Sequence, residues 1–268
     1  MTSEATMSDL DLLARLAKLG MRISREALEA LMRNAAKTKM SPVRLLEGVC
    51  HAEQLERDGR NLERRIKLAT LGNPPPLDEF DWNHPRKIDR PLYEQLLRLD
   101  FLRDGNNVLF RGPAGVGKTT LARHLGQRAL QGGFSVRFST LPAALADLLR
   151  QESLPATERR LIRYTRPSLL ILDELGYVPC DARAADLFFN IISRRHEVSS
   201  VVITTNLGFK QWGSVFHEAS CLSALIDRFA QHCHVVDIDA ESWRDKQSLR
   251  HKRKRTTAPR KPKPKPES

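Results

Sequence analysis

Near its middle the chain reads Gly112-Pro113-Ala114-Gly115-Val116-Gly117-Lys118-Thr119, which fits the pattern G-x-x-x-x-G-K-[ST] of a phosphate-binding loop. Its glycines let successive backbone N–H groups turn toward one anion, and a helix that starts at the loop adds the positive end of its dipole. We expect the loop, through Thr120, to bind a nucleotide. Lys118 would reach the β- and γ-phosphates, and the Thr119 hydroxyl would ligate Mg²⁺.

The flanking residues have the pattern that such a loop requires. An apolar stretch, Asn107 to Arg111, precedes it and is typical of a buried strand. The residues from Thr119 to Leu130 follow with helical spacing of their apolar side chains. The order strand, loop, helix therefore favours a nucleotide site over a glycine-rich turn that binds nothing.

A second stretch, Pro167 to Glu174, is almost continuously apolar and ends in two carboxylates. Such a run is typical of a strand that is buried on both faces of a parallel sheet. At its carboxyl end we expect Asp173 beside the loop, in the Mg²⁺ shell, and Glu174 placed to polarise a water. A strand followed by an acidic turn would look the same in isolation, and the loop upstream favours the catalytic interpretation.

A third apolar strand, Val201 to Asn206, also ends in polar residues. Asn206 would lie at the same edge as Asp173, where its carboxamide can orient the attacking water. Without that context an asparagine in this position is more often a turn residue.

Composition limits the class of protein. The chain has 268 residues, of which 41% are hydrophobic, so it can bury a core. No apolar run approaches the length of a membrane span, and the polar N-terminus resembles no targeting peptide, so we expect a cytoplasmic protein without a membrane partner. The net charge is +12, and residues 250–268 carry nine Lys/Arg against one Glu. This charge indicates a polyanionic partner, most simply nucleic acid, although a tail that only aids solubility would look the same.

Three parts are predicted along the chain. Residues 1–72 form a small helical domain with three helices, which start near Leu10, at the Ser24 cap and at Pro42. The Leu71–Pro76 turn leads into the nucleotide-binding domain, residues 73–249, in which one helix is expected from about Ile88 to Phe101. Residues 250–268 are a Lys/Pro-rich tail without the apolar residues for a core.

Several of these motifs together resemble the IstB-like transposition helper ATPases, which are AAA+ proteins close to helicase loaders of the DnaC type. The resemblance spans roughly Leu10 to Lys246, and the basic tail lies outside it. The motifs that carry it are Gly112–Thr119, Leu170–Tyr177, Phe188–Arg195, Ile203–Asn206, Leu225–Arg228 and Glu241–Arg244. One departure is Trp243, where the family usually has tyrosine.

The resemblance implies an α/β fold, with helices on both sides of a five-stranded parallel sheet. It gives Lys118 and Thr119 the Walker A roles, and Asp173 and Glu174 the Walker B roles. It further assigns three single residues: Asn206 as sensor 1, Arg228 as an arginine finger that reaches a neighbouring subunit's ATP, and Arg244 as sensor 2.

The implied activity is ATP hydrolysis at the subunit interfaces of a homo-oligomer that binds duplex DNA and presents it to a cognate transposase. The nearest alternative is a helicase loader, which would bind a helicase and single-stranded DNA. A small-molecule kinase is disfavoured by the basic tail and the arginine-finger position. A scaffold that binds ATP without hydrolysing it is disfavoured by Glu174.

Overall fold

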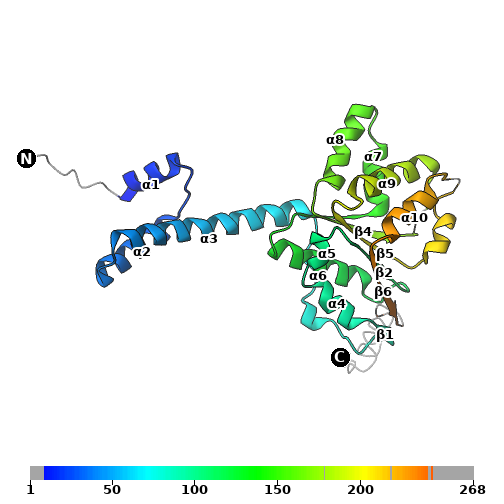
Figure 1. Ribbon diagram of the computed structural model, residues 1–268, viewed down its shortest axis with the longest axis horizontal. Coiled ribbons are helices and arrows are strands. Elements are labelled where there is room, and N and C mark those ends of the chain that lie inside the picture. The colour runs from blue at the N-terminus through cyan, green and yellow to red at the C-terminus, as the bar shows by residue number, and fades with distance from the viewer. Residues whose placement is uncertain (1–8, 178, 218, 241–242, 244–268) are drawn as a thin grey trace, which may run out of the picture. The chain divides into compact units, whose positions relative to one another are not determined.

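The computed structural model describes residues 9–177, 179–217, 219–240 and 243 (Figure 1). The chain divides into two compact units, Met1–Lys67 and Leu68–Ser268. The division falls a few residues before the Leu71–Pro76 turn because the chain is already packed into the second unit there: Ala69 and Leu71 are buried, and the Thr70 hydroxyl donates to the carbonyl oxygen of Phe138 at 2.6 Å.

The first unit consists of helices α1 (Asp9–Lys18) and α2 (Arg25–Thr38) and most of α3 (Pro42–Ala69). Ser24 caps α2 as predicted, because its side chain accepts a hydrogen bond from the Ala27 N–H. The Ser24 N–H and hydroxyl both donate to Glu56 of α3, which ties the start of one helix to the middle of the other. Arg60 pairs with Glu53 and Glu56 of the same helix, so its positive charge is compensated within α3.

The second unit is built on a six-stranded sheet with the order β1-β6-β2-β5-β4-β3. The five strands from β6 to β3 are parallel, as predicted. A sixth strand, β1, is the correction to the predicted strand count: it pairs antiparallel with β6 at the edge, Ile88 opposite Ile238. The strands are β1 (Lys87–Ile88), β2 (Asn107–Arg111), β3 (Val136–Thr140), β4 (Leu169–Leu175), β5 (Ser200–Thr205) and β6 (Cys233–Asp239).

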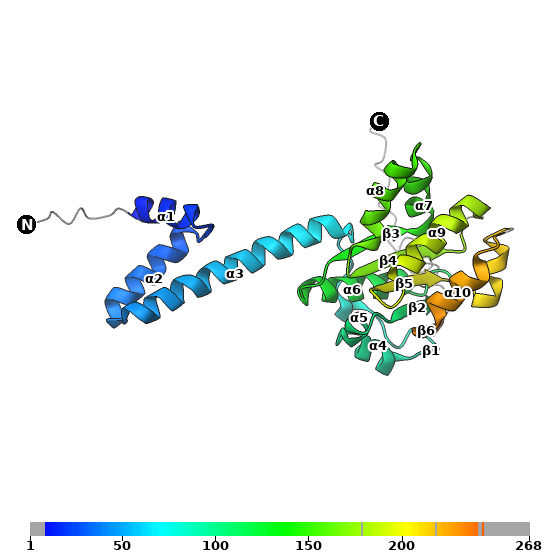
Figure 2. The same ribbon diagram turned by 45° about the horizontal axis from the view of Figure 1, so that its top comes forward.

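Helices cover both faces of this sheet, so the unit has three layers (Figures 1 and 2). Alternating residues of β4 show the two faces: Leu170 and Leu172 belong to the apolar core under α7, α8, α9 and α10, whereas Ile171 packs toward Gly126 of α6. The helices are η1 (Leu77–Glu79), α4 (Arg90–Leu96), α5 (Asp100–Arg103), α6 (Lys118–Gln131), α7 (Leu141–Leu149), α8 (Leu154–Thr165), α9 (Ala182–Arg195), η2 (Phe209–Ser214) and α10 (Leu222–Ala230).

The helix expected from Ile88 to Phe101 was wrong in its extent. It is two short helices, α4 and α5, separated at Leu99, whose backbone adopts a left-handed conformation with φ of 70°. Leu99 is 6% exposed and its side chain packs where a Cβ on Gly132 would lie, 2.7 Å away. Burial of this leucine at the end of α6 therefore overrides the helical propensity of the segment.

No helix within the described residues is both long and apolar enough to cross a bilayer. Arg244 and the Lys/Pro-rich tail, residues 250–268, lie outside the described residues.

Candidate functional site

The loop between β2 and α6 is shaped by close contacts that only glycine permits. A Cβ on Gly112 would lie 2.1 Å from the carbonyl oxygen of Ile238, which is backbone and cannot move aside. Gly117, with φ of 98°, caps the start of α6, and a Cβ there would lie 2.6 Å from the ring of Phe80. The loop thus presents its backbone at the positive end of a 14-residue helix, an arrangement suited to an anion.

Lys118 is held against this loop. Its side chain is nearly buried, with 6% of the residue exposed, and Nζ donates to the carbonyl oxygens of Gly112 at 2.7 Å and Pro113 at 2.6 Å. The ammonium group is therefore already at the mouth of the loop, where a phosphate would be bound.

Asp173 lies directly beneath the loop, at the carboxyl end of β4. It is 3% exposed, and the Thr119 hydroxyl donates to its Oδ1 at 2.9 Å. A hydroxyl and a carboxylate are hard oxygen donors, the type of ligand that Mg²⁺ prefers, so the donor set fits the predicted ion.

Glu174 points differently from the rest of its strand. The pairing of β4 with β5 is irregular between Leu172 and Leu175, and Glu174 has a φ of 67°, uncommon for a residue other than glycine. This distortion leaves Glu174 exposed at the pocket while Asp173 stays buried. Backbone strain of this kind is often found at functional sites.

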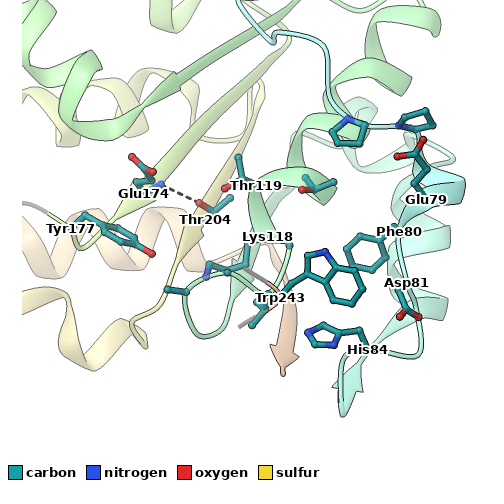
Figure 3. A pocket seen from close by; sticks show the side chains of 17 residues that line it. Glu79, Phe80, Asp81, His84, Lys118, Thr119, Glu174, Tyr177, Thr204 and Trp243 are labelled. Carbon is teal, nitrogen blue, oxygen red and sulfur yellow. Dashed lines mark hydrogen bonds between the residues drawn. The ribbon is translucent and has the colours of Figure 1, made fainter. Parts of the chain in front are cut away.

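Thr204 of β5 belongs to the site but was not predicted from the sequence. It is 2% exposed, and its hydroxyl donates a short hydrogen bond to Asp173 Oδ1 and accepts one from the Glu174 N–H at 3.0 Å (Figure 3). Strand alternation was the available signal, because Ile203 faces the core under α7 to α10 and its neighbour must face the loop.

Two further predicted side chains, Asn206 and Arg228, do not line the described pocket. Asn206 follows β5 and is exposed, with Oδ1 near Gly176, and it is not among the described residues that line the pocket. Arg228 of α10 donates a short hydrogen bond to Ser193 Oγ and lies 4.8 Å over the ring of Phe189; it too is outside the described pocket lining.

The loop residues from Ala114 to Thr120, together with Glu174 and Thr204, line one pocket of about 420 Å³. Glu174 and Tyr177 lie at one side and Phe80, His84 and Trp243 at the other, with Lys118 between them (Figure 3). The backbone N–H of Trp243 donates to the Gly115 carbonyl oxygen at 3.1 Å. The Trp243 ring meets the His84 ring edge to face, with ring centroids 4.6 Å apart. Trp82 does not line the described pocket and packs on Phe80 and Tyr93.

The pocket therefore has a polar end and an apolar end, which suit the two ends of a nucleoside triphosphate. Phosphates fit the loop, Lys118 and the Thr119–Asp173 pair. The aromatic and proline side, including Pro75 and Pro76, offers flat apolar surface of the kind that accepts a base. The residues between Pro75 and His84 gave no periodic signal in the sequence, which is why Phe80 and His84 were not singled out as pocket residues.

Comparison with known proteins assigns the family. The family model described as "IstB-like ATP binding protein" matches residues 14–251. A Pseudomonas aeruginosa protein named for insertion sequence IS21 and ATP binding is 36% identical over 251 residues, covering 92% of this chain and 91% of the relative. One from Geobacillus stearothermophilus, named for insertion sequence IS5376 and ATP binding, is 30% identical and covers 88% and 92%.

A solved structure agrees at the level of the fold. The crystal structure of DnaI superposes with a TM-score of 0.51 at 18% identity and covers 64% of this chain and 90% of that one. The strand–loop–helix geometry, the pocket and the matched length together show that this chain belongs to the family of IstB-like ATP binding proteins.

Proposed function

We propose that this chain hydrolyses ATP in an oligomer bound to duplex DNA and presents that DNA to a cognate transposase. The observation that carries the ATPase part is the convergence of four residues below the loop. The hydroxyls of Thr119 and Thr204 both donate to Asp173, and Glu174 is held beside them. This is the arrangement of oxygen ligands and a free carboxylate that phosphoryl transfer to water requires.

Each residue has a distinct part in the proposed reaction. The loop N–H groups and Lys118 bind the β- and γ-phosphates, and Thr119 and Asp173 hold Mg²⁺, which neutralises phosphate charge. Glu174 accepts a proton from a water molecule as the water oxygen bonds to the γ-phosphorus. The bond from that phosphorus to the β–γ bridging oxygen breaks, and ADP and phosphate leave.

Completion of the site by a second subunit is part of the proposal. An arginine that a second subunit places against the transferred phosphoryl group can raise the rate of hydrolysis by roughly 10³ to 10⁵-fold. Arg228 is anchored on α9, outside the described lining of its own subunit's pocket, which supports an action on a neighbour's ATP. Asn206 would orient water and Arg244 would contact the γ-phosphate of its own subunit, as the resemblance implies.

The DNA and transposase parts rest on the family and on charge. The two relatives above are named for insertion sequences, which move by transposition, and the chain has a net charge of +12. A helicase loader would share the fold but bind a replicative helicase. Pull-down with a transposase encoded beside such a protein, against pull-down with a replicative helicase, separates the two.

An ATPase assay with and without duplex DNA tests the proposal. We expect turnover that rises with DNA and with protein concentration, because both promote subunit contact. Lys118→Ala should abolish nucleotide binding, whereas Lys210→Ala, an exposed lysine outside the described pocket lining, should behave as wild type. Turnover that Lys118→Ala leaves intact would refute the assignment.

A further inference from the structure

A second concave site lies at the opposite edge of the sheet from β1, where β3 meets α7 and α8. It has a volume of about 310 Å³ and is separate from the nucleotide pocket, because the two share no lining residue. Helices α7 and α8, which contribute most of its lining, lie side by side in both views (Figures 1 and 2). Its lining contains four arginines and one carboxylate: Arg137, Arg150, Arg160, Arg163 and Asp147.

The single carboxylate is already engaged. Arg160 pairs with Asp147 through both Nε and Nη2, at 2.7 Å for Nε, and the Tyr164 hydroxyl donates to the same group at 2.7 Å. Burial, and then the neighbouring carboxylate, raise the pKa of Tyr164 to about 12, so the phenol stays neutral. Asp147 therefore positions Arg160 and compensates one of the four positive charges.

The other three arginines remain without a full counter-charge. Arg163 is 3.9 Å from Asp147, at the limit of an ion pair. Arg137 donates a hydrogen bond to the Leu68 carbonyl oxygen at 3.2 Å, and its buried Nε has no hydrogen-bond partner among the described residues. Arg150 is exposed and forms no ion pair within the part of the chain that the structure describes. Burial, and next the charge of Arg163, lower the pKa of Arg137, as expected where positive groups crowd together.

We propose that this arginine pocket, lined by Arg137, Arg150, Arg160 and Arg163, binds a phosphate group of the DNA backbone. Guanidinium forks match phosphate oxygens in pairs, and a concave site with a net charge of +3 attracts a compact anion. Apart from Ala143 and Ala146 the lining is polar, so it offers no apolar pocket for the side chains of an acidic peptide. The inference rests on the proposed function for the identity of the polyanion.

Arg150 and Arg163 are the residues to change, because neither side chain makes a hydrogen bond that holds the fold within the described residues. We expect Arg150→Gln with Arg163→Gln to weaken binding of a labelled duplex about tenfold or more near 0.1 M salt, measured by fluorescence anisotropy with a non-hydrolysable ATP analogue. The slope of log affinity against log salt should fall by about 1 to 2, since one or two fewer counterions are released.

Three controls keep the outcomes distinct. Arg128→Gln removes an exposed charge from α6, on the other face of the sheet, and should leave the slope unchanged. Arg150→Lys with Arg163→Lys should keep the slope and lose part of the affinity, because lysine supplies the charge without the fork. Nucleotide binding and thermal unfolding of each variant check that the remainder of the unit is intact.

The results distinguish a failure of the arginine-pocket inference from a failure of the proposed DNA binding. If the wild-type chain binds duplex DNA and the double glutamine variant binds it with the same affinity and slope, the arginine pocket is not a backbone site. An equal effect of Arg128→Gln would also overturn the inference, since only net charge would then matter. A wild-type chain that binds no duplex would overturn the DNA part of the proposed function and this inference with it.

Discussion

The Thr204 hydroxyl forms hydrogen bonds with both acidic residues of the site, Asp173 and Glu174. It donates to Asp173, which is proposed to hold the metal, and accepts from the N–H of Glu174, which is proposed to take the proton. A serine in this position could make both hydrogen bonds, and a valine of nearly the same shape could make neither. The side chain is therefore expected to act by positioning the two neighbours rather than by touching the substrate.

We predict that Thr204→Val lowers the ATPase kcat by about 10 to 100-fold and raises the Mg²⁺ concentration required, with nucleotide binding little changed. Thr204→Ser should restore most of the rate, because it restores the hydroxyl. Steady-state assays across a magnesium titration give both quantities. Unchanged kcat in the valine variant would show that the hydroxyl has no positioning role.

At this scale the sequence predicted the loop and the two strand-end carboxylates, because each lies within a contiguous pattern. It did not predict Thr204, which gains its meaning only from β5 lying beside β4 in the sheet. Asn206, two residues later, was predicted at the same edge as Asp173 to orient the attacking water, and it is exposed beyond the end of the strand. Phe80 and His84 were missed for a similar reason, since they come from a segment without periodicity and reach the loop only through tertiary packing.

Among the elements, α9 is anchored by a buried arginine. Arg195 is 1% exposed, and its guanidinium donates to five carbonyl oxygens at the ends of α8, β4 and β5, namely those of Tyr164, Thr165, Pro167, Ser168 and Ser200. Burial lowers its pKa to about 9. These bonds fix where β4 and β5 begin, and hence where Asp173 and Thr204 end up at the far ends of those strands.

We predict that Arg195→Met lowers the free energy of unfolding of the second unit by about 2 to 4 kcal/mol, because several buried carbonyls lose their donor. Arg194→Met is the matched control, since Arg194 pairs with Glu158 at the surface and should cost under about 1 kcal/mol. Urea unfolding followed by tryptophan fluorescence reports this unit, where Trp82, Trp212 and Trp243 all lie. Equal effects of the two changes would contradict the anchoring role.

In the helical unit, the strength of the hydrogen bonds between Ser24 at the start of α2 and Glu56 of α3 should depend on pH. Hydrogen bonds from the Ser24 hydroxyl, and next from the Ser24 N–H, lower the pKa of Glu56 below its ordinary value of 4.5. The carboxylate therefore stabilises the folded unit above that pH, and the stabilisation is lost as the pH falls through the lower folded pKa.

Hydrogen exchange at the Ser24 and Ala27 amides of the full chain measures this effect. We expect their protection factors to fall between pH 5 and pH 3, by more than those of amides in the middle of α3, such as Leu55, after correction for intrinsic exchange rates. Glu56→Gln should remove most of the pH dependence. A wild-type protection that stays constant over this range would show that Glu56 does not hold the start of α2.

The elements also show where sequence patterns fail. Long periodic helices and continuously apolar strands were predicted well, because burial on a fixed face requires those patterns. The segment from Ile88 to Phe101 was predicted as one helix because its leucines have helical spacing, but Leu99 is buried in a left-handed turn and Ile88 pairs with β6. Both features depend on partners more than 30 residues away, which local spacing cannot report.

For the molecule as a whole, the central claim is that ATP turnover requires a second copy of the chain. We predict that Arg228→Ala binds ATP but does not hydrolyse it, and that mixing it with inactive Lys118→Ala restores part of the activity. In the mixture some interfaces join an intact nucleotide site to an intact Arg228. Mixing Lys118→Ala with Glu174→Gln is the control without rescue, because both changes damage the same subunit's site. Absence of recovery in the first mixture, at protein concentrations where wild type is active, would contradict the action in trans.

Assembly itself tests this claim most directly. Electron microscopy of the protein with duplex DNA, with and without ATP, should show a ring or filament on DNA only when both are present. Glu174→Gln, which binds ATP without turnover, should make that assembly persist, while Lys118→Ala should prevent it. Single copies of the chain in the presence of both ATP and duplex DNA, or the same assembly without ATP, would contradict the account.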